Sequence, residues 1–159
     1  MKIKSQTITL DDLDRNILRL LQSNAKKTYS EIGRKLSVAH STVYERIKKM
    51  EEQGIIKKYT VAIDLEKIGK KPITAFMTVF TDPKESEVVA RKLSEMREVV
   101  EVATSLSEEL LIIAKVMAES QESLHTFIAQ KVVPLQGVLR IRTSIATKKF
   151  KEGEFPIEI

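Results

Sequence analysis

The stretch from Thr28 to Ile56 constrains the fold of this chain more than any other. It contains two short runs of apolar residues at helical spacing, separated by the connection Ser37-Val38-Ala39. The first run is Tyr29, Ile32 and Leu36, and the second is Val43, Ile47 and Met50. Gly54 can supply the left-handed residue that ends the second helix. Two short helices joined by a tight turn are the helix-turn-helix pattern, whose second helix enters the major groove of DNA.

The second predicted helix carries mostly polar side chains on the positions that do not point inward. Hydroxyl groups can bond base edges or phosphates, while Lys and Arg supply the phosphate contacts that dominate affinity. The predicted DNA-contacting residues are His40, Ser41, Thr42, Tyr44, Glu45, Arg46, Lys48, Lys49, Lys57 and Lys58. Those expected at base edges are Ser41, Thr42, Tyr44 and Glu45, and those expected at phosphates are Arg46 and the four lysines. Two alternatives stay open: Arg46 could brace the domain internally, and the stretch could be an ordinary helical hairpin with a solvated face.

The net charge of +5 is concentrated near the predicted helix-turn-helix. Residues 1–62 carry 13 Lys/Arg against 7 Asp/Glu, whereas the remaining 97 residues carry 14 against 15. The basic excess therefore lies where an electrostatic footprint for phosphate is needed.

Composition excludes several other classes of protein. The chain has no cysteine, so neither a disulfide framework nor a Cys-based zinc site is expected. No apolar run approaches the ~18 residues that span a bilayer, and no signal-peptide segment opens the chain, so a cytoplasmic protein without membrane contact is expected. His40 and His125 lie far apart in sequence without metal-ligand spacing, and no nucleophile–base arrangement is visible. We expect no metal, no cofactor and no enzymatic activity.

A supporting helix is predicted from Leu10 to Gln22, with acidic residues in its first turn that complement the helix dipole. After Gly54 the period changes, and residues 55–64 indicate a strand or the arms of a small wing. The run DLEKIGKKP at residues 64–72 has the composition of a hinge. The predicted organisation is a helix-turn-helix domain at 1–55, a wing or hinge strand with linker at 56–71, a second domain at 72–150 and a tail at 151–159.

The second domain repeats a strand–helix–strand pattern twice. The predicted strands are 73–80, 99–105, 110–117 and 138–147, and the predicted helices are 85–96 and 120–132. Two such halves predict a βαββαβ ferredoxin-like domain with an antiparallel four-stranded sheet, so the whole chain is of the α+β class.

Both faces of that sheet are apolar, although only two helices are available to cover them. Ile73, Ala75, Met77 and Val79 share one face of the first strand, and Phe76 and Phe80 share the other. An exposed apolar sheet face marks an interface, so we predict that two copies associate through it. The predicted dimer-interface residues are Phe76, Phe80, Leu111 and Ile113. The alternative is a different strand register, because short apolar runs are ambiguous.

Two segments carry a resemblance to a known family. They are LDDLDRNIL at residues 10–18 and the pattern Thr42-Val43-x-x-Arg46-Ile47 followed by Gly54-x-Ile56. With the βαββαβ domain after them, the chain from Leu10 to about Phe150 resembles the Lrp/AsnC (feast/famine) transcriptional regulators. The resemblance implies a homodimer, often assembled into tetramers or octamers, that binds double-stranded promoter DNA. It also implies a C-terminal domain that senses amino acids at subunit interfaces.

The chain departs from the family pattern at two places. Ala39 stands where the family usually has a serine that caps the recognition helix, and alanine lacks the oxygen needed for that bond. The family's Thr-Gly-x-Tyr-Asp effector segment corresponds here to the candidate effector residues Ser105, Leu106, Ser107, Glu108 and Glu109. Leu106 replaces a glycine whose bare backbone admits the ligand, whereas Glu109 could still pair with a ligand ammonium. The alternative is that this loop binds nothing and only turns the chain.

The sequence leaves two hypotheses for the function. The first is a sequence-specific regulator of the Lrp/AsnC type with an amino-acid effector. The second is an architectural, weakly specific DNA-coating protein without effector, whose binding would depend steeply on salt. RNA binding by the second domain is disfavoured, because residues 63–159 are slightly acidic.

Overall fold

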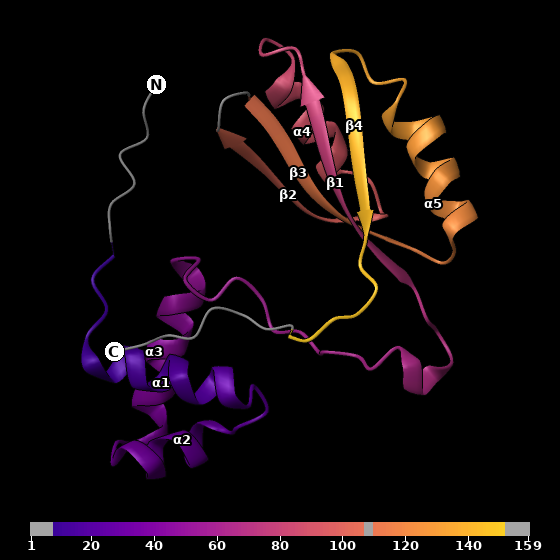
Figure 1. Ribbon diagram of the computed structural model, residues 1–159. Helices are drawn as coiled ribbons and strands as arrows, with labels where there is room; N and C mark the ends of the chain where they lie inside the picture. The colour runs from indigo at the N-terminus through magenta and orange to yellow at the C-terminus, as the bar shows by residue number, and fades with distance from the viewer. Residues whose placement is uncertain (1–7, 107–109, 152–159) are drawn as a thin grey trace. The chain divides into compact units, whose positions relative to one another are not determined.

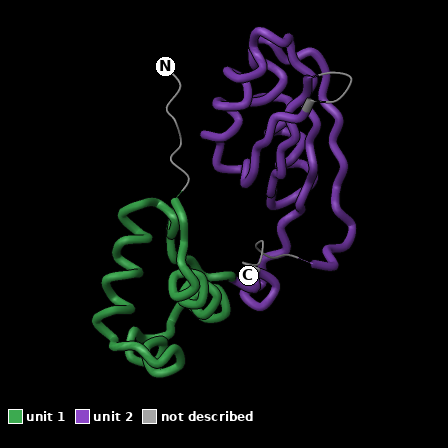
Figure 2. Tube along the Cα trace, turned by 90° about the vertical axis from the view of Figure 1, so that its left-hand side faces the viewer, with its two compact units in different colours: residues 1–62, 152–159 green, residues 63–151 purple. Residues whose placement is uncertain are grey.

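The computed structural model describes residues 8–106 and 110–151. Within these ranges the chain divides into two compact units, residues 8–62 and residues 63–151 (Figure 2). Each unit has its own apolar core, as expected for domains of this size.

The first unit is built from helices α1 (Asp12–Ser23), α2 (Tyr29–Leu36) and α3 (His40–Glu52) (Figure 1). One stripe of each helix is buried against the other two, as the helical spacing predicts. The buried core residues are Ile17, Leu18, Leu20, Ile32, Val43, Ile47 and Met50. The predicted supporting helix and helix-turn-helix are therefore both confirmed, with bounds shifted by one or two residues.

The ends of these helices follow from local sequence. Thr28 accepts a hydrogen bond from the backbone N–H of Glu31, whose carboxylate accepts one from the backbone N–H of Thr28. Gly54 has φ +70°, the left-handed conformation expected after α3. Helix α3 begins after Ala39, and within the described ranges no side chain caps it.

The turn between α2 and α3 depends on a close backbone approach. Ser37 adopts the left-handed conformation, with φ +57°, and the Val38 N–H donates to the Gly33 carbonyl at 2.9 Å. A Cβ atom at Gly33 would lie only 2.7 Å from the Val38 oxygen. Only glycine therefore lets α2 and the turn pack this closely, and the turn sets the direction in which α3 leaves.

The segment after α3 differs from the sequence prediction. Ile55 and Ile56 pack against the core of the first unit, but residues 57–64 form no strand. The physical reason is that a strand needs a neighbouring strand for its backbone hydrogen bonds, and none pairs with this segment in the described part of the chain. The expected hinge strand is therefore irregular chain with exposed apolar residues, among them Val61 at 74% exposure, and a 3-10 turn at Glu66–Ile68 follows it.

The second unit contains β1 (Ile73–Thr81), α4 (Ser86–Ser94), β2 (Val99–Leu106), β3 (Leu110–Ala118), α5 (Gln121–Phe127) and β4 (Val138–Ile145). In the described residues these strands form an antiparallel sheet in the order β2-β3-β1-β4 (Figure 1). This is the predicted βαββαβ arrangement. The predicted last helix is α5 continued by a π-helical turn at Ile128–Val132.

Helices α4 and α5 cover one face of the sheet. The core there joins strand residues such as Met77 and Ile112 to Leu93 of α4 and Phe127 of α5. None of the described residues of the second unit covers the opposite face in this way, and Phe76 and Ile113 are 49% and 43% exposed there. The alternation of β1 and β3 is thus as predicted: both faces are apolar and only one is buried.

Candidate nucleic-acid interface

Helix α3 has a clear division between a buried and an outward side. Val43, Ile47 and Met50 are buried, so positions about half a helical turn away point into solvent. The predicted residues that are exposed on α3 are His40, Ser41, Tyr44, Glu45, Lys48 and Lys49. Thr42 and Arg46 are half-buried at the edge of this face. The structure therefore brings the predicted base-contacting and phosphate-contacting side chains of α3 to one side of the first unit.

Arg46 occupies the internal role that its sequence position left open. Its Nη1 donates to Oδ1 of Asp14 at 3.1 Å and also to Oδ2 of Asp11, both near the start of α1. The two carboxylates raise the pKa of the Arg46 guanidinium, and the side chain is only 32% exposed. The same network lowers the pKa of Asp11, chiefly through the backbone N–H of Asp14 and then through Arg46. Arg46 thus joins α3 to the start of α1 through two ion pairs, and its contact with a phosphate stays a prediction.

Three tyrosines lie along the α2 side of α3. The rings of Tyr29 and Tyr44 meet edge to face with centroids 5.6 Å apart, and Tyr29 is 41% exposed. Tyr29 belongs to the apolar run of α2, but its ring and hydroxyl lie at the surface against Tyr44. The Tyr59 hydroxyl donates to Oε1 of Glu51 at 2.8 Å. Burial and this carboxylate raise the pKa of Tyr59 to about 12. Sequence reasoning missed Tyr29 and Tyr59 as parts of this surface, because neither lies on α3.

The lysines predicted at phosphates are all exposed. Lys48 lies 3.9 Å from Glu52, a weak pair one helical turn apart. Lys49, Lys57 and Lys58 are also exposed, and the last two follow α3 in the irregular segment. Long, solvated ammonium side chains at the edges of a helix can reach phosphates on either side of a groove.

The open face of the sheet holds the predicted interface residues. Phe80 lies opposite Leu111 on β3 and Arg140 on β4, so these three share the open face. The Arg140 guanidinium stacks over the Phe80 ring at 4.0 Å from its centroid. Thr78, opposite Ile113, continues the same face toward Phe76. The structure thus groups Phe76, Phe80, Leu111 and Ile113 on one surface.

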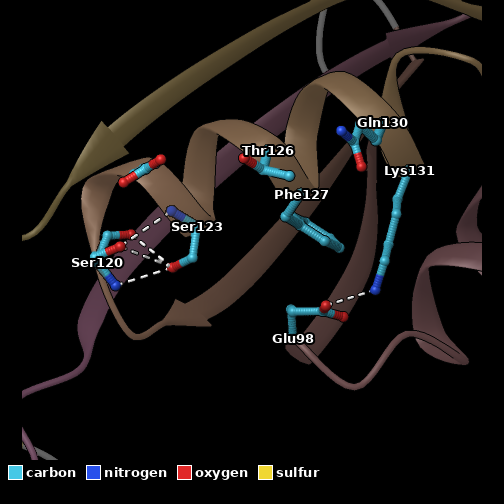
Figure 3. Close-up of a pocket in the computed structure, with 8 residues that line it drawn as sticks. Glu98, Ser120, Ser123, Thr126, Phe127, Gln130 and Lys131 are labelled. Carbon is cyan, nitrogen blue, oxygen red and sulfur yellow. Dashed lines mark hydrogen bonds and ion pairs between the residues drawn. The ribbon is translucent and has the colours of Figure 1, made fainter.

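The candidate effector segment lies mostly outside the described residues. Ser105 is half-buried and faces Leu111 across the sheet, while the side chain of Leu106 and residues 107–109 are not described. A separate hollow of about 430 Å³ lies beside α5, and Glu98, Ser123 and Lys131 are among its lining residues (Figure 3). There the Lys131 ammonium contacts Oε1 of Glu98 at 2.6 Å and lowers the pKa of that carboxyl. This hollow is wide open to solvent, and Ser105, the one predicted effector residue whose side chain is described, does not line it.

The described residues show neither a metal site nor a membrane-spanning helix. In residues 8–106 and 110–151, no group of three or more His, Asp or Glu side chains could hold a metal ion. The helices of those same ranges include none that is long and apolar enough to cross a membrane.

Each of the two units matches a model of a known protein family. A family model described as the AsnC-type helix-turn-helix domain matches residues 10–51, and the Lrp/AsnC ligand binding domain matches residues 74–154. The HTH-type transcriptional regulator Ptr1 of Methanocaldococcus jannaschii is 33% identical over 144 residues, which is 91% of this chain and 96% of Ptr1.

Solved structures show the same fold. The structure of E. coli AsnC matches with a TM-score of 0.84 at 24% identity, covering 94% of this chain and 100% of that one. A transcriptional regulator from Neisseria meningitidis, solved as a complex with L-Met, matches with a TM-score of 0.79 at 23% identity. That match covers 91% of this chain and 94% of the Neisseria chain.

Proposed function

This chain belongs to the Lrp/AsnC family of DNA-binding transcriptional regulators, and from that premise we propose that it recognises a specific promoter sequence as a homo-oligomer. Members of this family are transcriptional regulators and not enzymes. The observation that carries the proposal is the outward side of α3. It combines hydroxyl, carboxylate and ammonium groups on a helix held by a buried core and by the Arg46 ion pairs. Such a helix can contact base edges and phosphates at the same time.

Self-association through the open sheet face supports the same function. An exposed surface with Phe76, Leu111 and Ile113 at its centre is costly to leave in water. A two-fold dimer through this face would also provide two copies of α3. These could bind half-sites about 34 Å apart, one helical turn of DNA. Further assembly into tetramers or octamers is part of the same proposal, since it is expected of this family.

We also propose that an amino acid modulates DNA binding. The match to a ligand binding domain and the L-Met complex of the Neisseria neighbour support a small-molecule effector of this kind. Residues 105–109 are the proposed contact segment, and the adjacent charges of Glu108 and Glu109 favour a ligand with a positive group. Leu106 at the usual glycine position narrows the backbone approach, so the ligand should differ from those of typical family members.

The test is a binding experiment with the full chain at one fixed salt concentration. Its affinity for a fragment of its own promoter is compared with that for random DNA, with and without pooled amino acids. Selective binding that one amino acid shifts would support both the regulator and the effector proposals. Selective binding without any response would remove the effector proposal, while equal affinity for both DNAs would favour the architectural alternative.

A variant separates the effector segment from the DNA-binding surface. Glu109→Gln removes the proposed partner of the ligand ammonium without changing the first unit. It should weaken the amino-acid response and leave the affinity for promoter DNA in the absence of amino acid unchanged. A normal response in this variant would exclude Glu109 from the site.

A further inference from the structure

Glu45 occupies the middle of the outward side of α3. Residues of a helix are spaced by about 100°, so Glu45 lies about 180° from the buried side marked by Val43 and Ile47. It is the sixth residue of α3, in its second turn, and about 7.5 Å along the helix from His40. Recognition helices of this motif contact base edges with their N-terminal residues. Glu45 therefore lies on the part of α3 that would enter the groove.

The carboxylate of Glu45 has no counterion in the described part of the chain. Lys48 and Lys49, three and four residues further along the outward side of α3, form no ion pair with Glu45, and Lys48 lies instead 3.9 Å from Glu52. Arg46, the next residue, forms ion pairs with Asp14 of α1 and with Asp11, which caps that helix. Glu45 thus presents a free negative charge on a surface that must approach a polyanion, where an unsatisfied carboxylate opposes binding.

A hydrogen-bond donor on a base edge can offset that cost. In the major groove the donors are the N4 amino group of cytosine and the N6 amino group of adenine. Adenine places its N7 acceptor next to the amino group, where it repels the second carboxylate oxygen. Guanine and thymine offer acceptors at their edges, O6 with N7 and O4 respectively. Cytosine is therefore the base that suits a carboxylate best.

We propose that Glu45 is a specificity-determining residue that accepts a hydrogen bond from the N4 amino group of one cytosine in each half-site. This inference rests on the proposed function, because it requires α3 to lie in the major groove. Glu45 excludes thymine and guanine at that position by repulsion, while the flanking lysines supply most of the affinity. Selectivity and affinity thus come from different side chains of the same surface.

The experiment selects bound sequences from a random double-stranded DNA library, using the full chain and the variants Glu45→Ala, Glu45→Gln and Glu52→Gln. The wild-type sites should share one C·G pair at a fixed position in each half-site, and replacing it by T·A should lower affinity about tenfold or more. Glu45→Ala should lose the preference at that position alone. Glu45→Gln should change the preferred base to adenine, since an amide pairs with the N6 and N7 atoms of adenine. Glu52→Gln removes the same charge two turns away and should keep the wild-type preference.

The results separate this inference from the proposed function. If wild type and both Glu45 variants select identical sequences, the inference is overturned and the regulator proposal stands. If Glu45→Ala loses preference at every position, Glu45 acts through the fold of α3, and its role in reading cytosine is also overturned. If the wild type selects no sequence, both the inference and the proposed sequence-specific function fail.

Discussion

Replacing Arg46 by Met tests whether this residue braces the first unit or holds a phosphate. Met keeps much of the apolar stem of the side chain and removes the guanidinium. The substitution deletes the hydrogen bonds to Asp11 and Asp14 that join α3 to α1. Asp14 is only 8% exposed, so its carboxylate would lose its cation in a partly desolvated place.

The expected cost is about 1.5 kcal/mol in the free energy of unfolding of residues 8–62. Hydrogen bonds to charged groups contribute about 1.5–3 kcal/mol, and the low end is assigned to the pair with Asp14 because Arg46 is about one-third exposed. The pair with Asp11, whose carboxylate lies in solvent, is given no share of this cost. For a unit of this size, that loss lowers the midpoint of thermal unfolding by about 6–12 °C. The matched control is Arg91→Met, whose ion pair with Glu87 lies in solvent on α4 and should contribute little.

Tyrosine fluorescence provides an assay that is specific for the first unit. The chain has three tyrosines, at positions 29, 44 and 59, and no tryptophan. All three belong to the first unit, so the fluorescence transition reports on its unfolding within the intact chain. Arg46→Met should shift this transition, while Arg91→Met should not. An unshifted transition combined with weaker DNA binding would refute the bracing role and would favour a phosphate contact for Arg46.

The same network predicts a dependence on pH. The pKa of Asp11 is lower in the folded chain than its ordinary value of 3.8. Its ionised form therefore stabilises the first unit above pH 3.8, and this contribution is lost as the pH falls through the lowered folded pKa. In Arg46→Met, the free energy of unfolding of the first unit, followed by tyrosine fluorescence, should fall less steeply as the pH is lowered. The pH dependence should not disappear, because the Asp14 backbone N–H is the larger cause of the lowered Asp11 pKa.

Three further changes test other parts of the molecule. Phe76→Asp should dissociate the dimer in sedimentation velocity, whereas Val88→Asp, at a similarly exposed position on α4, should not; an unchanged profile for the first variant would refute the sheet interface. Lys48→Ala should weaken binding to promoter and random DNA alike and reduce the salt slope by about one, so a loss confined to one sequence would contradict a phosphate contact. In an absorbance titration, one tyrosine should ionise only near pH 12, and Glu51→Gln should lower that pKa; no change would exclude the Tyr59–Glu51 bond.

Local patterns were sufficient to predict the elements and the two faces that matter most. The spacing of Val43, Ile47 and Met50 fixes which side of α3 is buried, because a helix repeats every 3.6 residues. The remaining positions of α3, including Glu45, must then lie on its outward side. In the same way, alternation along β1 separates Met77 from Phe76 without knowledge of the neighbouring strands.

Contacts between distant segments could not be predicted in this way. Arg46 has the same local pattern as a phosphate contact, and only the packing of α1 against α3 brings Asp11 and Asp14 to its guanidinium. Tyr29 lies at the surface because the turn at Gly33 and Ser37 sets α2 beside Tyr44. The irregular segment at 57–64 has strand composition but lacks a partner strand in the described chain.

The sequence by itself therefore determined the helices, the four paired strands, most of their buried sides and the family to which the chain belongs, since these depend on residues close together in the chain. The tertiary structure decided which charges are neutralised on folding and which remain free to meet DNA. Arg46 is used inside the first unit, whereas Glu45 and the lysines of α3 stay at its surface. Ion pairs form between residues that are neighbours only in space. The fold was therefore needed to distinguish the neutralised charges from those that remain at the surface.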